Sequence, residues 1–122
     1  MSAAPVILAV DRNPHNLEVL AQFLGREGFT TRGVTTLEEF DAVLNEPAPV
    51  SLALVDIAGF DHQIWARCER LRDRDIPLLV LSARHSLAIH RESLAHGARG
   101  VLVKPLATRE LLGLIRGLMN ET

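Results

Sequence analysis

The sequence lacks several features that large classes of proteins require. It has one cysteine among 122 residues, Cys68, so no disulfide can form within the chain. No apolar run approaches the roughly 18 residues of a membrane span, and the first run, Val6 to Val10, follows Pro5 without the basic segment of a signal sequence. No unit of about 20 to 50 residues repeats. Disulfide-rich, membrane-spanning and solenoid proteins are therefore excluded, and we expect a cytoplasmic protein.

An excess of charge of one sign is also absent. Thirteen Lys or Arg stand against fifteen Asp or Glu, and this net charge of −2 is too small to drive binding to nucleic acid or membranes by itself. Basic residues outnumber acidic ones from Arg84 onward, but no aromatic residue that could stack on bases follows Trp65. We expect no direct contact with nucleic acid and none with a membrane. The length and the 48% hydrophobic content predict one domain, residues 1–122.

Short runs rich in Val, Ile and Leu alternate with segments of helical period. Residues 6–10, 52–55, 78–81 and 101–103 predict buried strands, and the more polar run 29–34 predicts an edge strand. Helix starts are predicted by Asn13 before Pro14 and by the capping box of Thr36 and Glu39. The stripes expected to face inward are Leu17, Leu20 and Leu24, then Leu37, Phe40, Val43 and Leu44, then Ile64, Cys68 and Leu71, then Leu87, Ala88 and Leu94, and last Leu111, Leu112, Ile115 and Leu118. Five strands alternating with five helices predict a doubly wound α/β fold with a five-stranded parallel sheet.

Polar residues follow the expected strands at one edge of that sheet. Asp11 follows the first strand, Asp56 the third, Ser82 the fourth and Lys104 the fifth. Because the carboxyl ends of parallel strands lie at one edge, we expect these side chains to share one pocket. Lys104 is the only lysine beside twelve arginines, and its compact ammonium group can enter a pocket that a planar guanidinium would not fill.

These strand ends lie in four motifs that resemble a known family. The motifs are Ile7-Leu8-Ala9-Val10-Asp11, Leu54-Val55-Asp56-Ile57, Leu79-Val80-Leu81-Ser82-Ala83 and Gly100-Val101-Leu102-Val103-Lys104-Pro105. In this order they resemble the response-regulator receiver domain of two-component signalling, over nearly the whole chain. The resemblance implies a single receiver domain with a flavodoxin-like fold and strand order 2-1-3-4-5, which acts in signalling and is not an enzyme.

The resemblance also implies a role for each residue of the pocket. Asp56 would be the phosphoacceptor, attacking a phosphohistidine or a small phosphodonor, and Ser82 would turn its hydroxyl toward the phosphoryl group. Lys104 would neutralise the phosphoryl oxygens, with Pro105 in a cis bond that aims it. Asp11, Asp56 and the backbone carbonyl of Ala58 would hold Mg²⁺. The implied partners are a histidine kinase or phosphotransfer protein and a downstream protein or output domain.

Three features depart from the family. Arg12 stands where the family has a second acidic metal ligand. The formal charge of the pocket is therefore zero, summed over Asp11, Asp56, Arg12 and Lys104. Because the pocket is already neutral, Mg²⁺ is expected to bind weakly. The Arg12 guanidinium could bridge the carboxylates in place of the ion, or it could point to solvent as an ordinary loop arginine. The loop after Asp56 is shorter and lacks the usual proline, and Val101 replaces an aromatic residue.

Several interpretations of function therefore remain open. The first is a receiver that accepts a phosphoryl group on Asp56 and relays the signal through a protein-binding face. The second is a divergent receiver with lost or impaired metal-dependent phosphorylation that acts as a constitutive interaction module. A flavodoxin-like cofactor enzyme is disfavoured, because the segment after the first strand, Asp11-Arg12-Asn13-Pro14, has no glycine-rich loop for phosphates. His15, His62 and His85 could collect a transition metal, but loop histidines in solvent are the simpler interpretation. The chain could be a whole protein or an N-terminal domain.

Overall fold

A single parallel sheet with strand order β2-β1-β3-β4-β5 forms the centre of the computed structural model, which describes residues 5–47 and 50–120. Its strands are β1 (Val6–Val10), β2 (Thr30–Val34), β3 (Leu52–Asp56), β4 (Leu78–Ser82) and β5 (Gly100–Val103). The helices between and after them are α1 (Pro14–Arg26), α2 (Leu37–Leu44), α3 (Gln63–Asp73), α4 (Leu87–Ala95) and α5 (Thr108–Met119). The predicted alternation of five strands with five helices is confirmed, as are the strand order and the polar edge strand β2.

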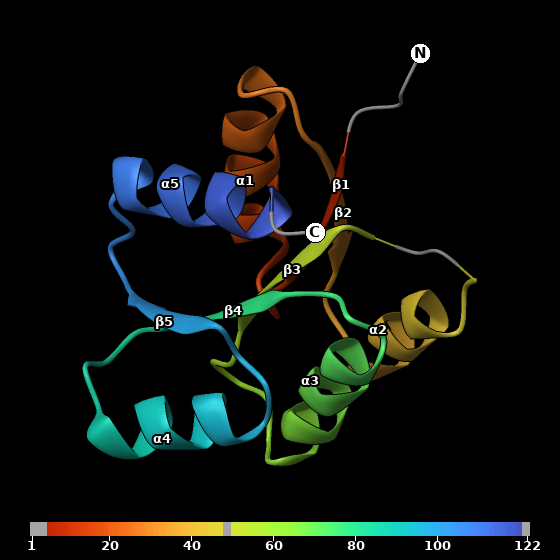
Figure 1. Cartoon of the computed structure of the whole chain (residues 1–122), viewed down its shortest axis with the longest axis vertical. Coiled ribbons are helices and arrows are strands. Elements are labelled where there is room, and N and C mark those ends of the chain that lie inside the picture. Colours follow the sequence, from red (N-terminus) through yellow and green to blue (C-terminus); the bar gives the residue numbers. More distant parts are fainter. Residues whose placement is uncertain (1–4, 48–49, 121–122) are drawn as a thin grey trace.

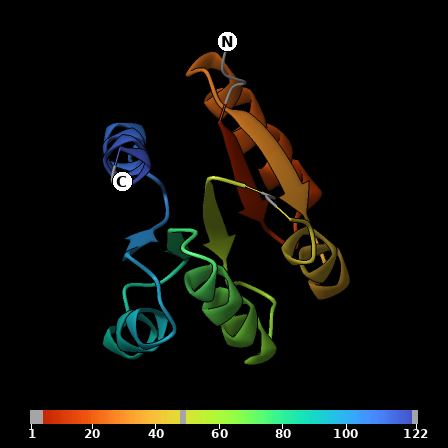
Figure 2. The same cartoon turned by 45° about the vertical axis from the view of Figure 1, so that its right-hand side comes forward.

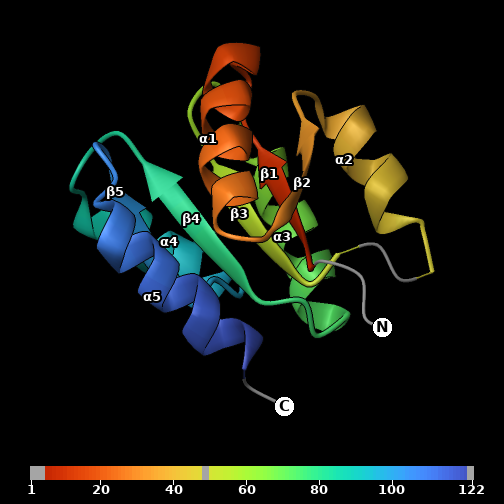
Figure 3. The ribbon, with the colours of Figure 1, turned by 90° about the horizontal axis from the view of Figure 1, so that it is seen from above.

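Helices cover both faces of the sheet. Helices α1 and α5 lie on one face and α2, α3 and α4 on the other (Figures 1 and 3), and the sheet twists between its edge strands β2 and β5 (Figure 2). Strand side chains alternate between the two layers: Ile7 packs with Leu24 and Ile115, whereas Leu8 packs with Phe40. Burial on both faces explains why the central strands are continuous apolar runs.

The helices begin where the capping residues predict. Asn13 Oδ1 accepts the backbone N–H of His15 at 2.9 Å, and Thr36 Oγ1 accepts that of Glu39 at 3.1 Å. The Glu39 carboxylate accepts the backbone N–H of Thr35 at 2.8 Å, one residue before the position that a strict capping box would use. These local bonds fix where the chain turns away from the sheet edge into α1 and α2.

The predicted inner stripe of α4 is wrong. Leu87 is 62% exposed and Leu94 44% exposed, and Ala88 is also exposed. The buried residue of α4 is Ser93, whose hydroxyl donates to the backbone oxygen of Ile89 at 2.6 Å. Helix α4 lies against the edge strand β5 (Figure 1), where it has little sheet surface to cover. It therefore buries only Ser93, and Ile89 is half-buried.

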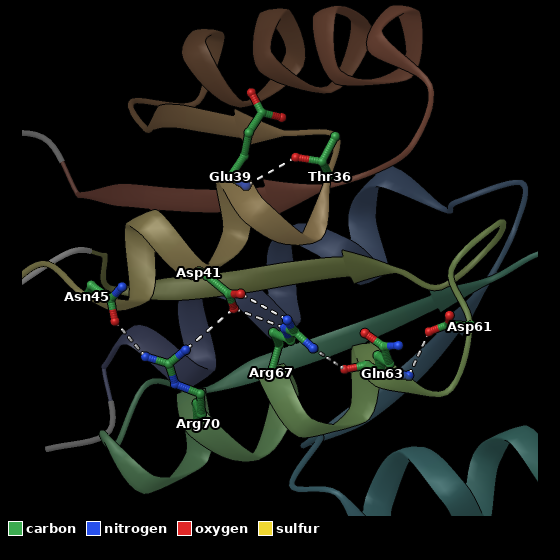
Figure 4. Close-up of polar contacts among 8 residues, drawn as sticks. All are labelled: Thr36, Glu39, Asp41, Asn45, Asp61, Gln63, Arg67 and Arg70. Atoms are coloured by element: carbon green, nitrogen blue, oxygen red, sulfur yellow. Dashed lines mark hydrogen bonds and ion pairs between the residues drawn. The ribbon is translucent and has the colours of Figure 1, made fainter.

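Arginines of α3 fasten α2 to α3, which the sequence analysis did not predict. Arg67 donates two hydrogen bonds to the Asp41 carboxylate, each 2.9 Å long, and Arg70 donates to Asn45 Oδ1 at 2.9 Å (Figure 4). The bonds from Arg67 hold the pKa of Asp41 below its usual value. Arg74 adds a bond to the backbone oxygen of Pro47 at 2.7 Å.

Over the described residues, no helix is long and apolar enough to span a membrane.

Candidate functional site

Asp56 is the last residue of β3, in the middle of the sheet. Its side chain is 1% exposed, because every residue of β3 is buried between the two helical layers. Oδ1 accepts the backbone N–H of Ala58 at 3.0 Å, and Oδ2 forms an ion pair with Lys104 Nζ. A buried carboxylate requires such partners, since removing its charge from water is costly.

Lys104 reaches Asp56 from the end of β5, two strands away. Its backbone N–H donates to the backbone oxygen of Ser82 at 2.8 Å, which anchors the end of β5 to the end of β4. The Lys104–Pro105 peptide bond is cis, as expected from the resemblance. The Lys104 side chain is 31% exposed, so its stem crosses the sheet edge while its ammonium group meets the buried carboxylate.

Asp11 lies at the end of β1, beside Asp56 in the sheet order. Its Oδ1 accepts the backbone N–H of Asn13 at 2.8 Å, and its Oδ2 accepts a bond from Asn16 Nδ2 at 3.2 Å. The second bond was not predicted, although Asn16 falls one turn into the helix that follows Asp11. Asp11 is therefore fixed by the first turn of α1.

Asp11, Asp56 and Lys104 line one cavity of about 650 Å³, so the structure brings these three predicted residues together. The cavity continues between α1 and α5, where its wall is apolar and includes Leu20, Phe23, Leu106 and Leu111. The carboxylates therefore stand at the polar end of a hollow whose remaining wall is largely apolar.

Ser82 is not among the residues that line this cavity. It is 2% exposed at the end of β4, and its hydroxyl both donates to the backbone oxygen of Arg84 at 2.9 Å and accepts the Arg84 N–H at 3.2 Å. Three of the four expected residues thus line the cavity, whereas the Ser82 hydroxyl is bonded to the loop after β4. The local turn satisfies the hydroxyl, and rotation about its Cα–Cβ bond would break both hydrogen bonds.

Arg12 does not bridge the carboxylates; it is exposed, in agreement with the second alternative. In the part of the chain that the structure describes, it forms no ion pair with Asp11 or Asp56. Its guanidinium carbon lies 5.2 Å from the centre of the Phe60 ring, a cation–π distance, while its stem lies along Gly59. A Cβ at Gly59 would be 3.2 Å from Arg12 Cγ, and Gly59 has a φ of +81°. Arg12 thus connects the loop after β1 to the loop after the candidate acceptor.

The oxygen donors present do not fit a tight Mg²⁺ site. The carboxylates of Asp11 and Asp56 and the Ala58 carbonyl are of the type that Mg²⁺ prefers. However, Arg12 replaces the third acidic group, and the ammonium of Lys104 already faces Asp56 Oδ2. Within residues 5–47 and 50–120, no group of three His, Cys, Asp or Glu side chains could hold a metal, which also leaves His15, His62 and His85 as separate residues.

Comparisons with known proteins agree on one family. The response regulator receiver domain family matches residues 7–116. The chain is 32% identical over 119 residues to the transcriptional regulatory protein GltR of Pseudomonas aeruginosa, covering 94% of this chain and 49% of that protein. It is 31% identical to AruR of the same species, with coverages of 99% and 52%. The chain thus spans about half the length of these curated relatives.

Solved structures give the same result. A CheY-like receiver domain from Methanospirillum hungatei is 28% identical, with a TM-score of 0.84 over 98% of this chain and 96% of that one. A response regulator from Burkholderia pseudomallei, solved with a phosphorylated aspartic acid and a calcium ion, is 25% identical, with a TM-score of 0.79 over 96% of this chain and 69% of that one. Phosphorylation on aspartate is the general function of the family, and its members generally bind Mg²⁺ and interact with histidine kinases and output domains. With its sheet order, its strand-end motifs and these matches, the chain belongs to the response regulator receiver domain family.

Proposed function

We propose that Asp56 is the residue of this receiver domain that accepts the phosphoryl group. The observation that carries the proposal is the buried Asp56 carboxylate at the end of the central strand, paired with the only lysine of the chain. Asp56 also lies on a cavity that gives a donor access. The phosphorylated aspartate of the similar Burkholderia response regulator supports the same chemistry.

In the proposed reaction, a carboxylate oxygen of Asp56 attacks the phosphorus of the donor. The new O–P bond forms as the bond to the leaving group breaks, and the leaving group is the imidazole of a phosphohistidine or the carboxylate of a small acyl phosphate. The acyl phosphate formed brings about two negative charges near neutral pH. Lys104 then pairs with a phosphoryl oxygen instead of Asp56 Oδ2, which keeps the new charge from being buried without a cation.

Ser82 and Arg12 supply the remaining contacts in this proposal. The Ser82 hydroxyl leaves the backbone of Arg84 and donates to a phosphoryl oxygen. Arg12 leaves the Phe60 ring and adds positive charge at the position where other receivers have an acidic metal ligand. Mg²⁺ is therefore expected to bind weakly, through Asp11, Asp56 and the Ala58 carbonyl, and to increase phosphorylation only modestly.

The test is intact-mass measurement after incubation with acetyl phosphate, with Mg²⁺ or with a chelator. Wild type is expected to gain the mass of one phosphoryl group in both conditions, and Asp56→Asn to gain none. Asp41→Asn removes a carboxylate of α2 that is distant from the site in the fold and serves as the matched control, which should be labelled as wild type is. Labelling of Asp56→Asn to the extent seen in wild type would refute Asp56 as the acceptor.

A second candidate function is a receiver domain that binds a partner constitutively. It is favoured by Arg12, which stands where other receivers have an acidic metal ligand. In that case neither wild type nor Asp56→Asn gains a phosphoryl group with or without Mg²⁺.

The proposed partners are a histidine kinase or phosphotransfer protein as the donor, and a downstream protein or output domain as the target. The named relatives are transcriptional regulators about twice as long as this chain, which supports an output domain. A cytoplasmic location follows from these proposed partners.

A further inference from the structure

The cavity at Asp56 extends well beyond the space around the carboxylates. Its volume of about 650 Å³ is within the range of sites that bind small organic molecules. From its polar end at Asp11 and Asp56 it runs between α1 and α5, where Phe23 and Leu111 are part of its wall. Asn16 and Phe23 both line it and are seven residues apart on α1, about 10 Å along the helix axis. This α1–α5 cavity is therefore long enough to hold a chain of several carbon atoms.

The polar end of the α1–α5 cavity carries one negative charge that no cation balances among the residues described. Asp11, Asp56 and Lys104 line this end, and Lys104 pairs with Asp56. The described partners of the Asp11 carboxylate are neutral donors, the Asn13 N–H at 2.8 Å and Asn16 Nδ2 at 3.2 Å. The charge of Asp11 is therefore available to a ligand.

Arg12 and His15, the basic residues nearest to Asp11 in the sequence, are directed elsewhere. The guanidinium carbon of Arg12 lies 5.2 Å from the centre of the Phe60 ring. The His15 side chain is 78% exposed, and its Nδ1 lies 3.8 Å from the Glu18 carboxylate. A divalent ion would reverse the charge of the polar end, whereas a singly charged group would neutralise it. A primary ammonium group carries one positive charge and donates three hydrogen bonds, which suits a pair of carboxylates.

From the charge and the shape together we propose that the α1–α5 cavity binds a small amphipathic amine. The ammonium group would pair with the carboxylates of Asp11 and Asp56, and the apolar chain would pack against Leu20, Phe23 and Leu106. A fatty acid brings a like charge to the carboxylates, and an alcohol brings no charge, so neither suits both ends of the cavity. The binding does not depend on the function proposed above. Its consequence does, because an occupied cavity would keep a phosphodonor from Asp56.

A free amine suits the cavity better than a lysine of a partner protein does. The Asp56 side chain is 1% exposed, so the ammonium group must reach it at the end of a slender chain. In a lysine, peptide groups follow the four-carbon stem. They would lie against the apolar wall at Phe23 and Leu106, where they lose hydrogen bonds to water without replacement. An alkyl chain loses no hydrogen bond there.

The test is titration of hexylammonium chloride into the unphosphorylated ¹⁵N-labelled protein at pH 7 and constant ionic strength. Propylammonium, hexanol, hexanoate and a lysine blocked at both its amino and carboxyl ends are titrated in parallel. Hexylammonium should shift the amide signals of Leu20, Phe23 and Leu106. It should bind at least about tenfold more tightly than propylammonium, because three further methylene groups leave water. It should also bind several-fold more tightly than hexanol and the blocked lysine, and hexanoate should not bind.

Two variants separate the charge from the apolar wall. Asp11→Asn should reduce the affinity for hexylammonium to that for hexanol. Asp73→Asn makes the same acid-to-amide change on the exposed surface of α3 and, as the matched control, should leave the affinity unchanged. Leu20→Asn should reduce the preference for hexylammonium over propylammonium and retain the preference for hexylammonium over hexanol. If Asp11→Asn does not fold, Leu20→Asn and the ligand series still decide the test.

Several results would overturn the inference. They are no binding of hexylammonium, equal affinity for hexylammonium and propylammonium, equal affinity for hexylammonium and hexanol, and signal shifts confined to residues outside the cavity. Tighter binding of the blocked lysine would also overturn it, because the occupant would then be a protein side chain. The titration contains no phosphodonor, so failure of the amine site is distinguishable from failure of the proposed phosphorylation of Asp56.

Discussion

Replacing Lys104 with methionine should destabilise the protein because it leaves the Asp56 carboxylate buried without a cation. Asp56 is 1% exposed, and apart from Lys104 its described contact is one hydrogen bond from the Ala58 N–H. Methionine preserves most of the length and apolar volume of the lysine stem. The change therefore removes the charge and little of the packing.

The magnitude follows from burial and access to water. Breaking a fully buried ion pair by removing one partner costs about 3–5 kcal/mol. Lys104 is 31% exposed and the pair lies on an open cavity, so water can partly hydrate the carboxylate left behind. We expect Lys104→Met to lower the free energy of unfolding by about 2–3 kcal/mol. In an Asp56→Asn background the same change should cost less than about 1 kcal/mol, because no charge is left unpaired.

Urea unfolding of the four proteins at pH 7, followed by Trp65 fluorescence and by circular dichroism, measures this coupling. Trp65 stacks on His96 with ring centroids 5.4 Å apart, so its emission should change when α3 separates from the end of α4. Arg91→Met on the exposed face of α4 is the matched control and should change stability by less than about 0.5 kcal/mol. A coupling energy below about 0.5 kcal/mol between positions 56 and 104 would refute the assignment of this pair as the charge balance of the site.

Three further results are expected. Arg12→Asp should bind Mg²⁺ at least about tenfold more tightly than wild type by calorimetry, because it exchanges a cation for a third carboxylate beside Asp11; equal affinities would show that Arg12 does not control metal binding. Asp41→Asn should lower the free energy of unfolding by about 1 kcal/mol at pH 7. Because the folded state lowers the pKa of Asp41, this stabilisation is complete above the ordinary carboxyl pKa near 4 and is lost as the pH falls through the lower folded value; a difference between the two proteins that is independent of pH in urea titrations from pH 7 to pH 2 would contradict it. Gly97→Ala should cost about 1–3 kcal/mol in thermal unfolding, because Gly97 has a φ of +103° and a Cβ there would lie 2.8 Å from Arg72 Cβ; an unchanged melting temperature would show that the turn relaxes.

The sequence alone was sufficient to predict the sheet and the convergence of three site residues. Strands buried on both faces must be apolar throughout, so residues 52–55 and 78–81 could be recognised without neighbours. Helix starts depend on bonds within three residues, as at Asn13 and Thr36. Once the strands are parallel, Asp11, Asp56 and Lys104 must emerge at one edge, and the structure places all three on one cavity.

Only the tertiary structure decided how side chains with several available partners are oriented. Helix α4 contains apolar residues on more than one side, and the narrow edge at β5 determined that Ser93 faces inward and that Leu87 faces outward. The hydroxyl of Ser82 and the guanidinium of Arg12 could each contact either the pocket or a loop. Both contact the loop: Ser82 bonds the Arg84 backbone, and Arg12 lies over the Phe60 ring. Burial of an apolar run is encoded in its own residues, whereas the position of a long polar side chain depends on the difference between contacts that residues distant in sequence supply.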